Sequence, residues 1–552
     1  MLQWPVDEST ADNSSSRFVP KPGHGRAVQP LAVKSWQVPQ HPGPLTVAQA
    51  MVFSEALKPD MLNDAQWDAI GKWMCLGGTV FVSEKSAEVI DRLKKATPLA
   101  MEPAVNFEQF SVHRCGSGSV REYSGPLFSA DDTKAPRLIA EAAARLSRYN
   151  VMTMLDETKL SWWQSENAAW TKMLVVIVFG VYTLLSGVVT LLLFRLDRRR
   201  IAIYTGIVVL TACVASLVLG GVLRNSAGDL RWVTVTQASP GGLVQVAKID
   251  VQSAGGRNTQ VTVRGKDVDL QLIESETVNS SRYYYYQTIE SNRAGYPAFS
   301  LQPNLLSEEP DACQINVPIT PWGYRQTWAA AFDPAARGLE VKLTYQSSDA
   351  SSLVDASMHL QSLAHLGKFT LTATNHLPFD LKNCQLVVSS TGVNLSETAA
   401  TPSYDPRTGN YRLREGSAIG DLTHVESTAA IGDLIPSQTV THPAVNMVAT
   451  TRNDRGIYYS GSQPGSESLP RIAANGATSA WIVGRISRSP ILSIDELRSD
   501  FKAFEEMHIF VQEILPEDMP DEWLKFQQLR LEKLVESAAK MKSQNAPVLL
   551  QQ

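Results

Sequence analysis

Two stretches of the sequence contain no acidic or basic side chain over more than twenty residues. They are residues 173–194 (MLVVIVFGVYTLLSGVVTLLLF) and residues 201–223 (IAIYTGIVVLTACVASLVLGGVL). A helix rises 1.5 Å per residue, so about 20 apolar residues cross a hydrocarbon core that is about 30 Å thick. The pattern predicts two transmembrane helices, joined by a six-residue loop into a hairpin.

The loop of this hairpin is rich in arginine. It contains Arg195, Arg198, Arg199 and Arg200. Short loops rich in Lys and Arg stay in the cytoplasm. We therefore expect a two-pass protein of the cytoplasmic (inner) membrane, with the hairpin tip in the cytoplasm and both large domains outside it. The lipid bilayer is then a partner.

The composition and the hydrophobic pattern of the sequence change near residue 46. Residues 1–45 are rich in Pro, Ser and Gly and show no sustained period, which is typical of irregular structure. Residues 46–150 alternate apolar strand patterns with helical ones, which favours a parallel sheet covered by helices. Within this domain Asn63 is a good N-cap for a helix, and the pair Gly77 and Gly78 ends it.

An external first domain needs an export signal, and no apolar signal peptide precedes residue 46. Two interpretations stay open. Either the chain lacks its natural beginning or carries an unrecognised one, or the first domain stays inside the cell and the charge rule fails. We favour the first.

Two segments of this domain carry a resemblance to a known family. Residues 62–84 (LNDAQWDAIGKWMCLGGTVFVSE) and residues 115–125 (CGSGSVREYSG), followed by a hairpin with an arginine-rich tip, resemble class I glutamine amidotransferase-like domains of bacterial membrane proteins. The resemblance implies an incomplete flavodoxin-like α/β domain, the transmembrane α-hairpin and a β-sandwich region. Such proteins are mostly of unassigned function, so architecture is implied more than activity.

After the second apolar run, the sequence alternates apolar and polar positions with a period of two. Gly, Pro, Asn and Asp break these runs, which favours β-sandwich structure. We expect a β-rich domain over residues 230–345 and a β-sandwich domain over residues 356–516, divided by a polar stretch at 347–357. In the second domain the residues of 368–375 predict a strand with Phe369, Leu371 and Ala373 on one face.

Two aromatic or apolar features are candidate contact surfaces. One is a run of four tyrosines, which either divide between core and surface or bind a partner. The other is an amphipathic helix predicted over residues 519–542, whose stripe docks on the chain's own β-domain or on a partner protein. The candidate residues are Tyr283, Tyr284, Tyr285, Tyr286, Trp523, Leu531 and Val535.

Charge and cysteine content exclude some classes of function. The net charge of −5 and the pI near 6.0 argue against nucleic-acid binding. The five cysteines are too few and too dispersed for a disulfide scaffold, and no C-x-x-C pair is present to hold zinc. Cys75 with Cys115, and Cys313 with Cys384, fall pairwise into two segments, but we favour buried free thiols over disulfides.

The sequence offers only weak candidates for catalytic residues. A working amidotransferase presents its cysteine on a strand-to-helix elbow with a histidine partner, and no such motif is present. Cys115 and His113 are the one cysteine and histidine in proximity in this domain, and they are weak catalytic candidates. We interpret the domain as a degenerate relative that lost its nucleophile, and we expect neither a cofactor nor a metal.

These features together predict an integral membrane component of the bacterial envelope. We expect it to act without catalysis in binding or assembly, with other envelope or membrane proteins as partners. Two alternatives stay open: an exported hydrolase or amidotransferase with an unrecognised site, and an accessory subunit of a membrane transport complex.

Overall fold

The computed structural model describes the following parts of the chain. It describes residues 2–4, 31–45, 48, 50–107, 110–127, 135, 138–139, separate positions between 173 and 199, 203–214, 228–239, 241–252, 257–266, 268–273, 305–309, 312–319, 324–346, 368–393, 402–405, 410–413, 422–446, 448–451, 479–495, 501–514 and 519–526.

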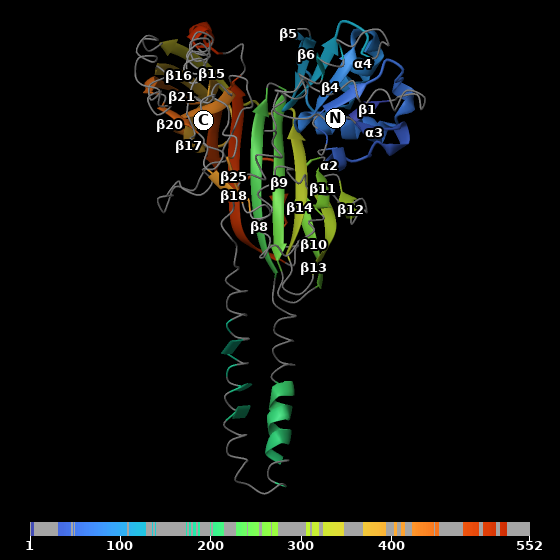
Figure 1. Ribbon diagram of the computed structural model, residues 1–552, viewed down its shortest axis with the longest axis vertical. Coiled ribbons are helices and arrows are strands. Elements are labelled where there is room, and N and C mark those ends of the chain that lie inside the picture. Colours follow the sequence, from blue (N-terminus) through green and yellow to red (C-terminus); the bar gives the residue numbers. More distant parts are fainter. Residues whose placement is uncertain are drawn as a thin grey trace.

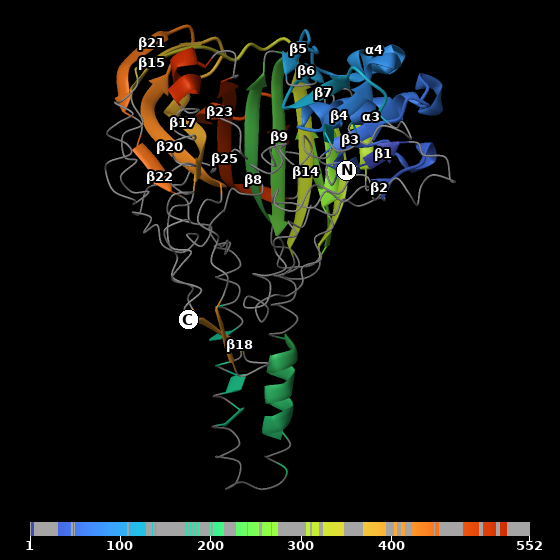
Figure 2. The ribbon, with the colours of Figure 1, turned by 45° about the horizontal axis from the view of Figure 1, so that its top comes forward.

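The centre of the molecule is a nine-stranded sheet in the order β11-β14-β9-β8-β25-β23-β17-β20-β22 (Figures 1 and 2). Every neighbouring pair is antiparallel except β8 and β25, which run parallel in its middle. The bounds are β11 (Asp269–Ile273), β14 (Tyr324–Asp333), β9 (Gly242–Gln252), β8 (Gly228–Ser239), β25 (Phe501–Ile514), β23 (Ser479–Ile486), β17 (Leu381–Val393), β20 (Leu422–Leu434) and β22 (Val448–Thr451).

Two smaller sheets cover one face of this large sheet. The four-stranded sheet has the order β12-β13-β10-β24, and the three-stranded sheet has the order β15-β16-β21. Each closes an apolar core against the large sheet, so the β-rich part of the chain consists of two β-sandwiches that share one sheet. The bounds are β12 (Leu305–Glu309), β13 (Ala312–Ile319), β10 (Arg257–Arg264), β24 (Ser493–Ile494), β15 (Leu339–Gln346), β16 (Lys368–Asn375) and β21 (Thr439–Asn446).

The two sandwiches exchange strands. β24 follows β23 in the chain but pairs with β10 in the four-stranded sheet, and β15 follows β14 but pairs with β16 in the three-stranded sheet. The side chain of Gln245 holds the segment before β24 in place, because its Oε1 accepts hydrogen bonds from the backbone N–H groups of Ile491 and Leu492 at 3.1 and 2.7 Å. A separate two-stranded sheet pairs β18 (Pro402–Asp405) with β19 (Asn410–Leu413).

The first part of the chain forms a seven-stranded mixed sheet in the order β2-β1-β3-β4-β7-β6-β5. The expected strand-helix-strand-helix order is present from β3 to α4. Asn63 and Gln66 form a capping box at the start of α3, with hydrogen bonds of 2.9 and 3.0 Å. The bounds are β1 (Leu2–Trp4), β2 (Leu31–Ala32), η2 (Ser35–Gln37), α2 (Pro42–Leu45), β3 (Ala50–Phe53), η3 (Pro59–Met61), α3 (Asp64–Cys75), β4 (Thr79–Ser83), η4 (Glu84–Ser86), α4 (Ala87–Ala96), β5 (Val105–Phe107), β6 (Phe110–Cys115) and β7 (Gly118–Tyr123).

The expected fold class is nevertheless wrong. A flavodoxin-like domain needs a helix between successive parallel strands. Here β5, β6 and β7 follow one another through connections of two residues and pair antiparallel, which leaves no room for a crossover helix. The described residues are mainly β-strand, and neither a flavodoxin-like domain nor a transmembrane α-hairpin is among them.

The helical side of the first sheet packs on the second face of the large sheet. One apolar core contains Trp73 and Leu99 from the first part of the chain together with Val233, Trp328 and Phe332 from the large sheet. Residues of β8 alternate strictly, because Val233 and Val235 face this core while Leu230 and Trp232 face the four-stranded sheet. The molecule therefore has three layers, with the large sheet in the middle.

The prediction of a two-pass membrane protein is also wrong for the part of the chain that is described. Within that part, no helix combines the length and the apolar character that a membrane crossing requires. The described helical residues 203–214 lie apart from the sheets in Figure 1. Most of the run 173–194 and nearly half of the run 201–223 lie outside the described residues. The proposed inner-membrane location depended on these runs, so it is withdrawn together with the bilayer as a partner.

Other expected features fall outside the described residues. They are the polar division at 347–357, the tyrosines 283–286, and the final helix beyond residue 526. Of the arginine cluster only Arg199 is described, as a helical and exposed residue, while Arg195, Arg198 and Arg200 are not. The described residues do not test the assignment of these arginines as topology determinants.

Candidate functional site

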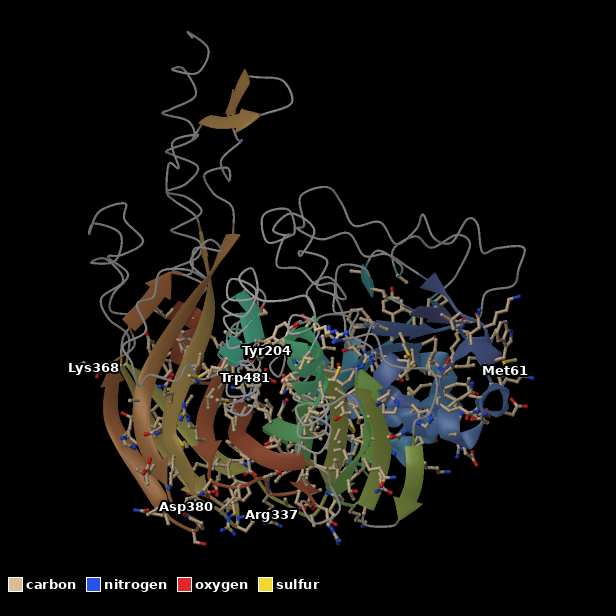
Figure 3. All side chains as sticks on the ribbon, turned by 90° about the horizontal axis from the view of Figure 1, so that it is seen from below. Met61, Tyr204, Arg337, Lys368, Asp380 and Trp481 are labelled. Carbon is tan, nitrogen blue, oxygen red and sulfur yellow. The ribbon has the colours of Figure 1, made fainter. Side chains whose placement is uncertain are left out.

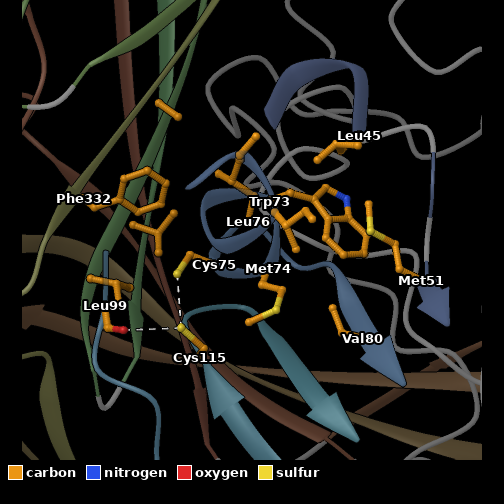
Figure 4. Close-up of a cluster of buried hydrophobic side chains, with 14 of the residues drawn as sticks. Leu45, Met51, Trp73, Met74, Cys75, Leu76, Val80, Leu99, Cys115 and Phe332 are labelled. Carbon is orange, nitrogen blue, oxygen red and sulfur yellow. Dashed lines mark hydrogen bonds between the residues drawn. The ribbon is translucent and has the colours of Figure 1, made fainter. Parts of the chain in front are cut away.

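Two cysteine side chains meet where the first sheet packs on the large sheet. Cys75 is the last residue of α3 and Cys115 is the last residue of β6. Their Sγ atoms are 3.2 Å apart, and the two residues are 0% and 1% exposed. Figure 4 shows the pair between Leu99, Met74 and the large sheet, with Phe332 nearby. The structure therefore brings together two thiols that are far apart in the sequence.

Two glycines allow the backbone segments around the thiols to pack closely. Ser117 donates its N–H to the carbonyl oxygen of Cys75 at 2.9 Å. Gly116 has a φ of +58°, and a Cβ there would lie 2.6 Å from the same carbonyl oxygen. A Cβ on Gly118 would lie 2.2 Å from the carbonyl oxygens of Met74 and Gly78. The β6–β7 turn can lie against the end of α3 only because these positions lack side chains.

The two thiols differ in acidity. Burial raises the pKa of Cys75 well above its usual value, and the hydrogen bond with Cys115 raises it further. The hydrogen bond from Cys75 lowers the pKa of Cys115 and outweighs the effect of burial there. Cys115 is therefore the first of the pair to become a thiolate. As a thiol, it donates to the carbonyl oxygen of Leu99 at 3.5 Å.

Polar contacts connect this region to the large sheet. The hydroxyl of Ser117 donates to Oε1 of Gln237 on β8 at 2.5 Å. Lys72 of α3 forms an ion pair with Asp269 of β11, with 3.0 Å between Nζ and Oδ2. Both lysine and aspartate side chains are less than one-fifth exposed, at 17% and 13%. The thiol pair thus lies beside a junction that is held by apolar packing and by buried polar contacts.

His113 does not serve as a base for Cys115. Its Nδ1 lies 3.2 Å from the carbonyl oxygen of Glu102, and its Nε2 lies 3.6 Å from Oε2 of Glu122. The sulfur of Cys115 instead contacts Cys75 and Leu99. The geometry is that of a buried thiol pair and not that of a cysteine–histidine nucleophile.

The remaining cysteines are separate. Cys313 lies in the core of the sandwich formed by the four-stranded sheet, and Cys384 lies in the core of the other sandwich. Burial, and next the charge of Asp433, raise the pKa of Cys384 to about 12. Cys213 is exposed on the helical segment 203–214. Within the described part of the chain, no group of three or more potential ligands gathers to hold a metal ion.

A second feature is an exposed tryptophan on a fixed turn. Trp36 lies in η2 and is 75% exposed. The buried side chain of Gln66 donates to the carbonyl oxygens of Ser35 and Val38, both at 2.8 Å. Lys34 donates its N–H to Oε1 of Gln37 at 2.7 Å and closes the same turn. The sequence gives no signal for Trp36, because it lies in a segment rich in Pro, Ser and Gly.

Trp523 is placed in the protein interior. It is 0% exposed and packs against Tyr345 and Phe369, with ring centroids 5.0 Å away in each case. The residues 521–526 therefore dock on the chain's own three-stranded sheet. The other candidate surface residues, Leu531, Val535 and the four tyrosines, lie outside the described residues.

No protein-family model matches the sequence, and no curated protein matches it. The solved structures that match include the zebrafish (Danio rerio) Fcho1 mu homology domain with a bound Eps15 peptide, with 8% identity and a TM-score of 0.23, covering 53% of this chain and 96% of that chain. They also include the yeast delta-COP-I mu-homology domain in complex with a Dsl1 peptide, with 9% identity and a TM-score of 0.16, covering 52% of this chain and 94% of that chain. Likeness at these TM-scores supports no conclusion about this chain.

Proposed function

We propose that this chain is a non-catalytic binding or assembly component whose partner is a protein. The observation that carries the proposal is the exposed indole of Trp36 on its fixed turn. Tryptophan is enriched among the residues that contribute most to protein–protein binding, because it buries a large apolar area in the complex.

The turn supports binding because it is ordered before a partner arrives. Gln66 is 6% exposed and belongs to the capping box of α3, so its own position is fixed by the helix. Its amide then holds the backbone on both sides of Trp36. Binding to a preorganised side chain loses less conformational entropy than binding to a free one.

The neighbouring turn adds a second apolar side chain. Met61 of η3 is 44% exposed and lies at the outer side of the first part of the chain in Figure 3. Trp67, the next residue after Gln66, donates its indole N–H to the carbonyl oxygen of Pro59 at 2.9 Å and holds this second turn on α3. Two adjacent residues in the first turn of α3, Gln66 and Trp67, therefore hold the two turns that carry the exposed side chains. Methionine is also enriched in protein interfaces.

The experiment is site-specific photo-crosslinking in the cells that produce the protein. A photoreactive amino acid replaces Trp36, and the matched control carries it at Ile435, an apolar residue that is 53% exposed on the β20–β21 connection. We expect one or a few discrete protein adducts at position 36, identified by mass spectrometry, and none of these at position 435. Equal adduct patterns at the two positions would overturn the proposal.

A second variant tests the preorganisation. Gln66→Ala removes both hydrogen bonds that fix the turn but leaves the photoreactive group at position 36. We expect weaker adducts of the same mass. Unchanged adducts in a Gln66→Ala protein with a normal melting temperature would show that the fixed turn has no part in binding.

The hydrolase or amidotransferase alternative makes a different prediction for the thiols. A nucleophilic cysteine must reach its substrate, whereas Cys115 is 1% exposed and contacts Cys75. For a binding component, a Cys115→Ser variant keeps the adducts at position 36. Loss of those adducts, in a variant that is folded by circular dichroism, would favour the alternative.

A further inference from the structure

We propose that Cys75 and Cys115 are a redox-sensitive modification site, which a small-molecule disulfide such as oxidised glutathione converts into a disulfide bond. This inference is independent of the proposed protein-binding function. It rests on the position of the two sulfur atoms and of the backbone around them.

The two sulfur atoms need to move little to form the bond. They are 3.2 Å apart, whereas a disulfide has an S–S distance of about 2.05 Å. The sulfurs must therefore approach by about 1.2 Å, a distance that small side-chain rotations cover. The backbones are already close, because Ser117 N–H bonds to the carbonyl oxygen of Cys75 at 2.9 Å and a Cβ on Gly116 would lie 2.9 Å from the Cα of Cys75.

The chemistry is a pair of thiol–disulfide exchanges. The thiolate of Cys115, after losing its proton to solvent, attacks one sulfur of oxidised glutathione and releases one glutathione thiolate. Cys75 then loses its proton and attacks the Cys115 sulfur of this mixed disulfide, which releases the second glutathione thiolate. The protein loses two protons and two electrons in total, and one oxidised glutathione becomes two glutathione thiols.

The order of attack follows from the contacts of the pair. The hydrogen bond from Cys75 lowers the pKa of Cys115, and burial raises that of Cys75. Both side chains are buried, so the reagent gains access through local opening where the β6–β7 turn lies against the end of α3. Closure of the disulfide then ties the two elements together. We therefore expect oxidation to be slow in the folded protein and to protect the β6–β7 turn from opening once it is complete.

The bond has a structural consequence because it closes a long loop. The segment from Cys75 to Cys115 contains β4, α4, β5 and β6. A cross-link across such a loop restricts the unfolded chain and stabilises the folded state, provided that it strains the native geometry little. Oxidation is therefore expected to raise the melting temperature of the transition that includes the first sheet.

The experiment uses the full chain with Cys213→Ser, because Cys213 is exposed and reacts with any disulfide reagent. The protein is incubated with oxidised glutathione, and the remaining thiols are alkylated after unfolding. We expect Cys75 and Cys115 to escape alkylation and to appear as one linked peptide pair, with Cys313 and Cys384 alkylated. The melting temperature is expected to rise by a few degrees and to return after treatment with a phosphine reductant.

Two results would overturn the proposal. One is full alkylation of Cys75 and Cys115 after prolonged incubation under conditions where hydrogen exchange shows that the β6–β7 turn opens. The other is a stable glutathione adduct on Cys115 with no linked peptide pair. The matched variants Cys75→Ala and Cys115→Ala must lose the linked peptide, and the protein with both cysteines intact supplies the main readout if either variant fails to fold.

Discussion

Lys72 and Asp269 join two parts of the molecule that are far apart in the sequence, with Nζ of the lysine 3.0 Å from Oδ2 of the aspartate. Lys72 belongs to α3, and Asp269 begins the edge strand β11 of the large sheet. Burial alone would lower the pKa of Lys72, but the carboxylates of Asp269 and Asp68 outweigh burial and raise that pKa. The lysine is therefore charged in the folded protein, and the pair fixes the rotation of α3 over the sheet.

Removal of the lysine charge is predicted to weaken the junction. Lys72→Met leaves the carboxylate of Asp269 buried without its cation, which we expect to lower the free energy of unfolding by about 3 kcal/mol. Denaturant unfolding followed by circular dichroism measures the change. The control is Lys94→Met, since Lys94 pairs with Asp91 at 3.9 Å on the surface of α4 and such pairs contribute at most about 1 kcal/mol. Equal effects of the two substitutions would show that the junction pair is not special.

The β6–β7 turn offers a test of close backbone packing. Gly118→Ala would place a Cβ 2.2 Å from two backbone carbonyl oxygens, so we expect a loss of more than about 2 kcal/mol in the free energy of unfolding. Gly432→Ala is the matched control, because Gly432 has a φ of +95° but no atom within 4 Å of the added Cβ. Gly432→Ala should lower the free energy of unfolding by about 1–2 kcal/mol, from backbone strain alone. A milder effect at Gly118 than at Gly432 would contradict the packing of the turn on α3.

Trp523 is predicted to anchor the final described helix to the three-stranded sheet. Trp523→Ala removes a side chain that is 0% exposed and stacks with Phe526. We therefore expect the free energy of unfolding to fall by about 3–5 kcal/mol. Trp523→Phe should lower the free energy of unfolding much less, because the indole nitrogen has no hydrogen-bond partner among the described residues. Thermal unfolding of both variants, with the neighbouring Leu524→Ala as a control, separates packing from surface effects. A Trp523→Ala protein as stable as Leu524→Ala would place Trp523 outside the core.

His508 is predicted to make stability depend on pH. It is buried in the middle of the large sheet, where its Nδ1 lies 2.9 Å from the hydroxyl of Thr234 on the parallel strand β8. Burial lowers the pKa of His508 from its usual value of 6.5, although Glu506 opposes this shift. Below pH 6.5 the unfolded chain therefore binds more protons than the folded chain. Stability is highest above that pH and falls as the pH decreases.

The measurement is the free energy of unfolding between about pH 5 and 7.5 for the native protein and for His508→Gln. The native protein should lose stability toward low pH with an extra slope of up to about 1.4 kcal/mol per pH unit relative to the variant. Identical slopes in the two proteins would mean that the pKa of His508 is the same in the folded and in the unfolded chain.

Local features of the fold could be predicted from the sequence. Asn63 caps α3 as expected, and β16 runs over Lys368–Asn375 with Phe369, Leu371 and Ala373 buried. These features depend on residues that are close in the chain, where capping preferences and the period of two decide the outcome.

Strand partnership could not be predicted in the same way. Nothing in the alternation of β8 indicates that it pairs parallel with β25, or that β24 leaves its neighbours to join β10. Such pairings depend on how apolar faces combine across hundreds of residues. The charge-free runs predict two spanning helices, whereas no helix among the described residues is long and apolar enough to cross a membrane.

The candidate site shows the same limit. Cys75 and Cys115 could be paired from the sequence only by their order along the chain, whereas their contact depends on the two glycines that bring the turn against α3. The fixed position of Trp36 could not be predicted either, because its turn is held by Gln66, a residue of a helix that begins well after it.

The first part of the chain and the large sheet share one apolar core, so we expect the first part of the chain and the two sandwiches to move as one unit. Pulsed electron paramagnetic resonance measures it directly, with labels attached through non-natural amino acids at Lys95 on α4 and Glu340 on β15, both exposed. One narrow distance distribution that matches the structure is predicted. A broad or two-peaked distribution would contradict the shared core at the junction.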